Sequence, residues 1–182
     1  MATGFIERIK GKILLSAASL GKFGGAGASF GLSGQISAQQ SAAGVGNTAD
    51  TNEDTLFTYS LPAGSLDVAG RSMLIEAWGS FANNSHSKHA RLYFGSEVVD
   101  TGANTTTGAI GWYLSIDVVK TGANTQQMTA QLITGTTHGG CTTQAGAETD
   151  TAAIVIKATG QTATSSSAGD ILCNGFSVTA LN

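Results

Sequence analysis

The chain has 182 residues, enough for one globular domain with an appendage and a sizeable core. Only 12% of the residues are charged and the net charge is −3, so no basic excess is present that would neutralise nucleic-acid phosphates. No apolar run reaches the length of a membrane span, and 25 glycines beside many β-branched threonines disfavour helices.

Residues 1–54 differ from the rest of the chain. Residues 5–20 favour a short amphipathic turn or helix, and residues 21–34 are glycine-rich with single apolar side chains. Such a segment buries too little apolar surface to compensate for the conformational entropy it would lose on folding alone. We therefore expect an extended anchoring arm that becomes ordered on a partner. The alternative is an arm packed back on its own domain. The expected anchors, placed in pockets of the partner, are Phe5, Ile9, Ile13, Phe23, Phe30 and Leu32.

Two other interpretations of this region are rejected. The apolar stretch 13–20 is similar to a weak secretory signal. However, Glu7 interrupts the basic region before it, and Lys22 interrupts the segment that follows it. Residues 50–54 begin like a calcium-binding loop, yet Thr55 replaces the required glycine and a leucine replaces the bidentate glutamate. We therefore expect no signal peptide and a solvated acidic linker.

From Thr55 onward, apolar and polar residues alternate with the period of strands that have one buried face. The first expected strands are 57–61, 72–81, 90–94 and 97–99, separated by turn signals at 62–64 and 95–96. The most strongly patterned stretch is 110–119, whose apolar face predicts that Trp112 is a core residue. Copies of Thr-Gly-Ala-Asn-Thr at 101–105 and 121–125 bracket it and read as turns.

The remaining elements are a strand at 125–134, a long loop at 135–151, a strand at 152–159 and a last strand at 171–181, where Gly175 allows a bulge. About eight strands with short turns and no convincing helix are the signature of an antiparallel sandwich. The sequence thus predicts an arm at 1–54 and a β-sandwich domain at 55–182.

A resemblance narrows this architecture. Leu-Phe-Thr-Tyr-Ser-Leu-Pro-Ala at 56–63 leads to Gly-Arg-Ser-Met-Leu-Ile-Glu-Ala-Trp-Gly at 70–79, followed by Ala-Asn-Asn at 82–84, Lys88 and Leu-Tyr-Phe-Gly at 92–95. The whole resembles a jelly-roll module of tailed-bacteriophage structural proteins, over about residues 55–182. The resemblance implies an antiparallel jelly roll, usually trimeric, that serves in head decoration, head fibres or tail fibres. It implies no catalytic residues.

The search for chemistry gives weak candidates. His86 and His89 stand three apart, but they lie at a turn into a strand, where their side chains need not converge on a metal. His138 precedes Cys141 in the expected long loop without an orienting third group. Cys141 and Cys173 favour reduced thiols over a disulfide. We expect no metal, no cofactor and no catalytic residue.

The strand faces add one pair of carboxylates and one pair of aromatic residues. Glu76 and Asp117 are central in expected strands and would either pair like glycosidase acids or lie on a solvated face. Trp78 and Tyr113 lie opposite the core faces of their strands, which makes them candidates for a subunit contact.

The favoured hypothesis is a non-enzymatic virion protein, a trimeric capsid decoration or head-fibre protein. Its arm would bind the major capsid protein or another virion protein, and its location would be the capsid surface after synthesis in the host cytoplasm. No nucleic acid and no membrane is expected. One alternative is a tail-fibre module that recognises host glycans through 86–89 and 135–151. A second is a secreted carbohydrate-binding or carbohydrate-active sandwich that uses Glu76 and Asp117.

Overall fold

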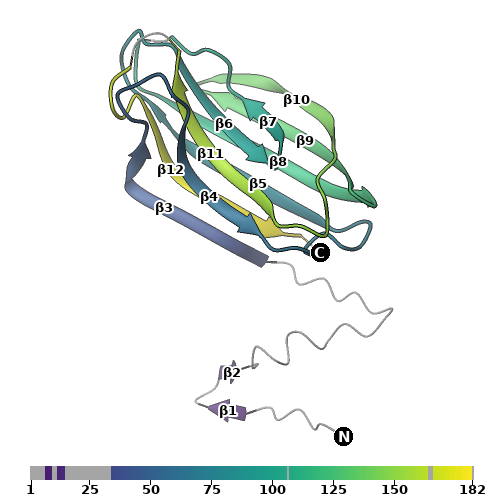
Figure 1. Ribbon diagram of the computed structural model, residues 1–182. Coiled ribbons are helices and arrows are strands. Elements are labelled where there is room, and N and C mark those ends of the chain that lie inside the picture. The colour runs from purple at the N-terminus through teal and green to yellow at the C-terminus, as the bar shows by residue number, and fades with distance from the viewer. Residues whose placement is uncertain (1–6, 10–11, 15–33, 106, 164–165, 182) are drawn as a thin grey trace, which may run out of the picture. The chain divides into compact units, whose positions relative to one another are not determined.

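The computed structural model describes residues 7–9, 12–14, 34–105, 107–163 and 166–181 (Figure 1). The chain divides into two compact units, Met1–Leu32 and Ser33–Asn182. In the first unit, β1 (Glu7–Ile9) pairs antiparallel with β2 (Lys12–Leu14). The short helix or turn expected at 5–20 is therefore wrong for these residues. Two β-branched isoleucines on either side of a glycine favour a hairpin over a helix.

Over its described residues, the second unit is an antiparallel β-sandwich of ten strands (Figure 1). Its six-stranded sheet has the order β10-β9-β8-β5-β12-β3, and its four-stranded sheet has the order β4-β11-β6-β7. The strands are β3 (Gly34–Gly46), β4 (Asp54–Leu61), β5 (Ser72–Phe81), β6 (Lys88–Phe94), β7 (Glu97–Asp100), β8 (Ile110–Gly122), β9 (Thr125–Thr134), β10 (Thr137–Gly146), β11 (Ile154–Thr162) and β12 (Ile171–Ala180). The predicted all-β antiparallel sandwich is confirmed, with ten strands rather than about eight. Among the described residues, no helix is long and apolar enough to cross a membrane.

The two additional strands are the outer strands of the six-stranded sheet. β3 pairs with β12 and lies within the segment that was expected to be arm, so the sandwich begins about twenty residues before Thr55. β10 pairs with β9 and occupies most of residues 135–151, so the long loop expected there is wrong. Both strands are mostly exposed and contain few apolar residues, so they lack the alternation of apolar and polar residues that reveals a strand in the sequence.

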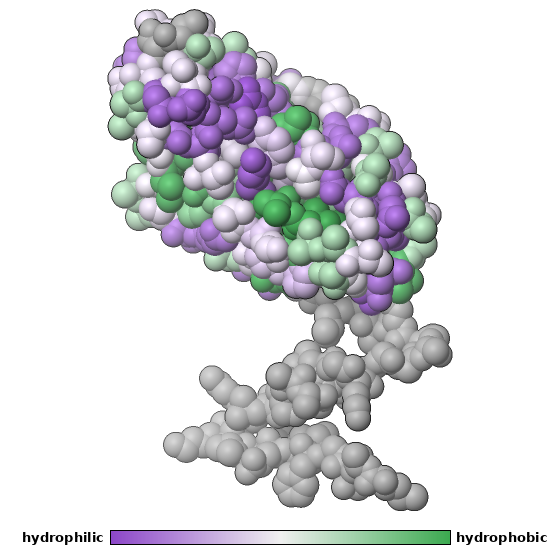
Figure 2. Space-filling model, viewed as in Figure 1, coloured by the Kyte–Doolittle hydropathy of each residue, from purple (hydrophilic) through white to green (hydrophobic). Residues whose placement is uncertain are grey.

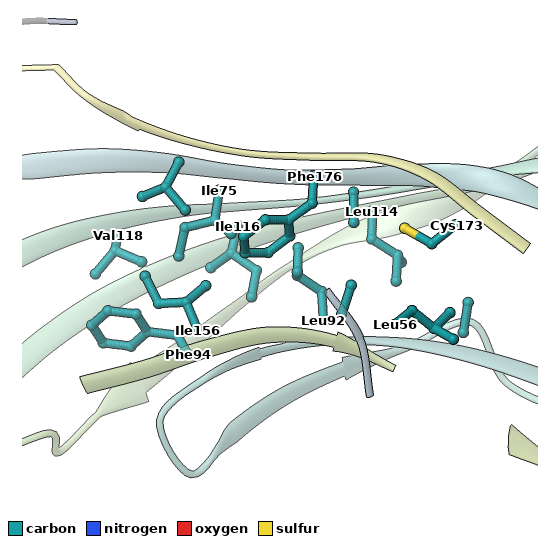
Figure 3. Packing of buried hydrophobic residues seen from close by; sticks show 14 of the residues in the cluster. Leu56, Ile75, Leu92, Phe94, Leu114, Ile116, Val118, Ile156, Cys173 and Phe176 are labelled. Carbon is teal, nitrogen blue, oxygen red and sulfur yellow. The ribbon is translucent and has the colours of Figure 1, made fainter. Parts of the chain in front are cut away.

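The core lies between the two sheets (Figure 3). β8 contributes Trp112, Leu114, Ile116 and Val118, each at most 2% exposed, so the predicted core position of Trp112 is confirmed. Side chains of the four-stranded sheet, among them Leu92, face this row from β6 and β11. The continuous apolar layer fixes the register, because a shift by one residue would turn every core side chain outward.

The pairing of strands from the two ends of the sandwich sequence is nested. β3 pairs with β12, β4 with β11, β5 with β8 and β6 with β7. The β9–β10 hairpin follows β8 and widens the six-stranded sheet. The pairing of β12 with both neighbours is irregular between Cys173 and Gly175, which agrees with the bulge expected at Gly175.

Candidate functional site

The solvent-facing side of β5, β8 and β12 carries the two aromatic residues that were expected at a subunit contact. Trp78 of β5 stands directly opposite Tyr113 of β8 and Gly175 of β12. A methyl group added at Gly175 would overlap the Trp78 ring, so the indole packs closely against the backbone of β12 at Gly175. Both aromatic residues are half-buried. We call this surface, made of Leu74, Glu76, Trp78, Tyr113, Ser115, Asp117, Gly175 and Ser177, the outer aromatic face.

The two carboxylates of this face have different surroundings. Tyr113 donates its hydroxyl to Glu76 Oε1 at 2.6 Å, and Ser177 donates to Oε2 at 3.1 Å. Burial, followed by the bond to Glu76, raises the pKa of Tyr113 to about 12, so the phenol stays a donor at neutral pH. Asp117 Oδ1 is buried and has no hydrogen-bond partner among the described residues. The two hydroxyl donors therefore fix the orientation of the Glu76 carboxylate. The Oδ1 atom of Asp117, in contrast, accepts no hydrogen bond from the described residues.

No lysine or arginine lies on the outer aromatic face among the described residues. Every basic side chain of the sandwich has a partner elsewhere. These side chains are Arg71 with Asp67, Lys88 with two carbonyls, Arg91 with Asp100 and Glu53, Lys120 with Asp150, and Lys157 over Tyr93. The face thus suits a neutral partner surface or polar hydroxyl groups, and it repels phosphates.

The solvent-facing side of the four-stranded sheet is different in character. Arg91 Nε lies 2.6 Å from Asp100 Oδ2, and Arg91 Nη1 lies 3.0 Å from Glu53 Oε2. Although burial opposes it, the bond from Arg91 helps to hold the pKa of Asp100 below its ordinary value. Figure 2 shows this side of the sandwich, where hydrophilic residues gather over one part and hydrophobic patches are smaller. Covering the Arg91 network would require desolvating charges, whereas the exposed side chains of Val98 and Val155 add apolar surface to the same sheet.

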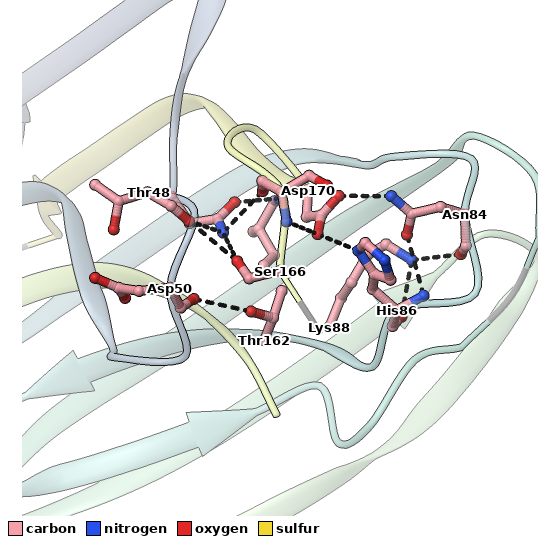
Figure 4. A network of polar contacts seen from close by, with 11 residues as sticks. Thr48, Asp50, Asn84, His86, Lys88, Thr162, Ser166 and Asp170 are labelled. Atoms are coloured by element: carbon pink, nitrogen blue, oxygen red, sulfur yellow. Dashed lines mark hydrogen bonds and ion pairs between the residues drawn. The ribbon is translucent and has the colours of Figure 1, made fainter. Parts of the chain in front are cut away.

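A buried polar cluster ties the loops at one end of the sandwich (Figure 4). Asp170, 1% exposed, accepts hydrogen bonds from Asn84 at 2.6 Å and from His86 Nδ1 at 2.7 Å. Burial alone would raise the pKa of Asp170, but these donors and the Ser167 amide hold it below its ordinary value. Lys88, which is fully buried, donates to the carbonyl oxygens of Asn84 and His86. The cluster fixes residues 82–87 and residues 166–170 against each other.

The two histidines weighed as metal ligands do not converge. His86 bonds to Asp170 in the loop cluster, whereas His89 Nδ1 lies 3.0 Å from Asp100 on the four-stranded sheet. No group of three or more His, Cys, Asp or Glu residues with metal-binding geometry occurs among the described residues.

The cysteine candidates also separate. His138 and Cys141 lie in β10 rather than in a loop, opposite Ile133 and Gln131. Cys173 is a free, buried thiol in β12. Burial raises its pKa to about 12, which makes it unsuitable as a nucleophile at neutral pH.

The acidic linker is confirmed as a hydrogen-bonded turn. Asp50 accepts the amide of Asn52 at 2.8 Å, and Asp54 accepts both the amide and the hydroxyl of Thr48. Glu53 turns towards the four-stranded sheet, where Thr159 donates to it. The carboxylates point to different partners instead of one cation.

The expected arm anchors fall mostly outside the described residues. Ile9 and Ile13 lie in β1 and β2, where Ile9 is opposite Lys12 and Ile13 is opposite Arg8. The anchors Phe5, Phe23, Phe30 and Leu32 lie outside the described residues.

Two grooves open along β9 and β10. One of about 380 Å³ is lined by threonine, glutamine, alanine and glycine from β8, β9 and β10. The other, of about 210 Å³, lies between β7 and the overhanging β9–β10 hairpin, and Asp100 is the titratable residue in its lining. Neither lining brings together an acid and a base of the kind that proton transfer requires.

No protein-family model, no curated protein and no solved structure matches this chain.

Sequence reasoning did not foresee the buried clusters around Asp170 and Asp150. A signal was present, because Lys88 and Lys120 stand in phase with the core-facing residues of β6 and β8. A lysine at a core position needs a carboxylate or carbonyl partner. That requirement points to the loops at the ends of the sandwich, where the partners lie.

Proposed function

We propose that this chain is a non-enzymatic structural virion protein of a tailed bacteriophage, a homotrimeric head-decoration or head-fibre protein. The observation that carries the proposal is the nested pairing of β3 with β12, β4 with β11, β5 with β8 and β6 with β7. A chain rolled up in this order has the pairing expected of a jelly roll, the architecture of many viral capsid domains. The protein would be made in the host cytoplasm and reside on the capsid surface.

The first unit supports an anchoring role. Residues 1–32 contain four basic residues and one acidic residue, a net charge of +3, whereas the remaining residues contain five basic and eleven acidic, a net charge of −6. The arm therefore favours an acidic capsid surface that would repel the sandwich. Its single apolar side chains would supply the anchors that fill pockets on the capsid.

The outer aromatic face supports the trimer contact. Trp78 and Tyr113 offer large apolar surfaces of the type enriched in subunit interfaces. The carboxylate of Glu76 already accepts two hydroxyl donors, which lowers the cost of covering it with a neighbouring subunit. The charged side of the four-stranded sheet would then remain in solvent.

Removing residues 1–32 tests the anchoring role without disturbing the sandwich, because β3 begins at Gly34. The truncated chain is expected to remain a folded trimer, measured by circular dichroism and light scattering, and to lose cosedimentation with capsids of the encoding phage. Full-length Phe23→Ser/Phe30→Ser retains the arm and its charge but lacks two of the proposed anchors, so it should also bind capsids more weakly. Capsid binding by the truncated chain at the wild-type level would contradict the proposal.

Substitution of Trp78 tests the subunit contact. Trp78→Ala is expected to shift the trimer towards monomer while the far-ultraviolet spectrum is retained. Tyr93→Ala, on the opposite side of the sandwich, is the control and should remain trimeric. A trimer of unchanged stability in Trp78→Ala would place the contact elsewhere.

The second candidate is recognition of host glycans, and the same face favours it. Trp78 and Tyr113 stand opposite each other and are both half-buried, so their rings would offer a stacking platform for a sugar ring. Glycan-array binding that is lost in Trp78→Ala, without a change in oligomeric state, would favour this candidate over the trimer contact.

A further inference from the structure

The end of the sandwich opposite the Asp170 cluster contains a buried lysine and aspartate in direct contact. Lys120 is the last core-facing residue of β8 and stands opposite Gln126 of β9; these residues are 4% and 2% exposed. The Lys120 ammonium contacts the Asp150 carboxylate, which reaches it from the loop between β10 and β11. The two side chains are 3% and 13% exposed, so water has little access to the pair.

The aspartate is held in place from several sides. The amide of Asn124 donates to Asp150 Oδ2 at 2.8 Å, and the amide of Asp150 donates back to the Asn124 side chain at 3.1 Å. Asn124 has a φ of 51°, the left-handed conformation that aims its amide at this carboxylate. Gln126 Nε2 donates to Asp150 Oδ1 at 3.3 Å. Each carboxylate oxygen therefore has its own donor.

The lysine, in contrast, has a single partner. Among the described residues, the Lys120 ammonium has no hydrogen-bond partner beyond the Asp150 carboxylate it contacts. The other lysine buried in the sandwich, Lys88, donates to two backbone carbonyls, at 2.7 and 2.9 Å. An ion pair in a dry site is costly, because both charges lose their contact with water and the ammonium has only one partner to replace it.

We propose that Lys120 and Asp150 form an intramolecular isopeptide bond. The amine nitrogen of Lys120 attacks Cγ of Asp150, so the Nζ–Cγ bond forms and the Cγ–Oδ2 bond breaks. Two protons of the original ammonium leave with Oδ2 as water, and the third stays on the amide nitrogen. The opposite charges of the pair cancel, so the step needs no oxidant, reductant or further reactant.

The surrounding groups assist this condensation. Direct contact supplies the proximity that a bimolecular reaction would lack. Gln126 Nε2 faces Oδ1, the oxygen on which negative charge develops when the nitrogen adds to the carbon. The exclusion of water favours the product, because hydrolysis of the amide would require water to enter. The bond would join the end of β8 covalently to the loop before β11.

Intact-protein mass spectrometry of the denatured full-length chain tests the proposal. The expected mass is that of the sequence less one water molecule. Trypsin should then fail to cleave after Lys120 and release residues 92–157 as one peptide, also lighter by one water, because no other lysine or arginine lies between Arg91 and Lys157.

Two substitutions control the measurement. Lys120→Arg keeps the positive charge but should restore the full calculated mass, while Lys88→Arg should keep the loss of water. If the wild-type protein has the full calculated mass and trypsin releases residues 92–120 and 121–157 separately, the pair is an ordinary ion pair and the proposal is refuted. Loss of water that persists in Lys120→Arg would equally refute it. Neither result bears on the virion role.

Discussion

Trp78 packs closely against Gly175, and this contact gives a quantitative test of how the outer aromatic face is built. Gly175→Ala puts a methyl group where the indole now lies, so the ring must lift towards solvent or the backbone of β12 must move. A packed tryptophan covers about 150–250 Å². Lifting one side would expose roughly 80 Å², which corresponds to about 2 kcal/mol at about 25 cal/mol per Å².

The assay is a double-mutant cycle on urea unfolding with Gly175→Ala, Trp78→Ala and the combined variant. Gly175→Ala is expected to lower the free energy of unfolding by about 2 kcal/mol in the wild-type background. In the Trp78→Ala background the expected loss is less than about 0.5 kcal/mol, because the indole ring that the new methyl group would overlap is absent. In a Trp112→Phe background, Trp78 is the remaining tryptophan, and its emission should shift to the red when Gly175 is replaced. Equal losses in both backgrounds would show that the indole does not lie over Gly175.

Two further predictions concern buried titratable groups. Since burial raises the pKa of Cys173 to about 12, its thiol should resist alkylation at pH 8 in the folded protein and react once urea unfolds the chain; rapid alkylation in the native state would contradict its placement in the core. Asp170 has a folded-state pKa below its ordinary value, so the stability that it contributes is present above the unfolded-state pKa and is lost as the pH falls through the folded-state value. Asp170→Asn should therefore cost about 2–3 kcal/mol at pH 7, and the loss should shrink below about pH 4. Urea unfolding at pH 7 and pH 3 measures this difference, and a pH-independent loss would refute the role of the charge.

The inner strands could be predicted from the sequence because their apolar alternation is unbroken. β5 and β9 have the bounds expected, 72–81 and 125–134, and β8 extends only a few residues beyond its expected end. The outer strands of the six-stranded sheet could not, since β3 consists mainly of serine, alanine, glutamine and glycine and exposes most of its length. A strand of this kind is defined by its backbone hydrogen bonds to β12, and such bonds produce no recognisable pattern in the amino-acid sequence.

The candidate site was predictable in part for the same reason. Trp78 and Tyr113 could be assigned to the outer side of their strands because strict alternation fixes the face. The partner of Tyr113, the Glu76 carboxylate, depends on the register between β5 and β8, which pattern alone does not supply. The core phase of Lys120 indicates that it needs a polar partner, but which loop residue supplies that partner, here Asp150, depends on how the sandwich closes.

The outer strand β3 has consequences for the solubility of the isolated protein. Its 13 residues contain no charge and no proline, the usual devices that keep a sheet edge from recruiting another strand. The pairing of β3 with β12 is instead irregular at two places, between Cys173 and Gly175 and between Val178 and Thr179. Such irregularities twist an edge away from the flat geometry that polymerisation requires. The irregular backbone pairing of β3 with β12 would then protect the protein against aggregation. Substitutions in β12 that make this pairing regular would promote fibre formation, although β3 itself is unchanged.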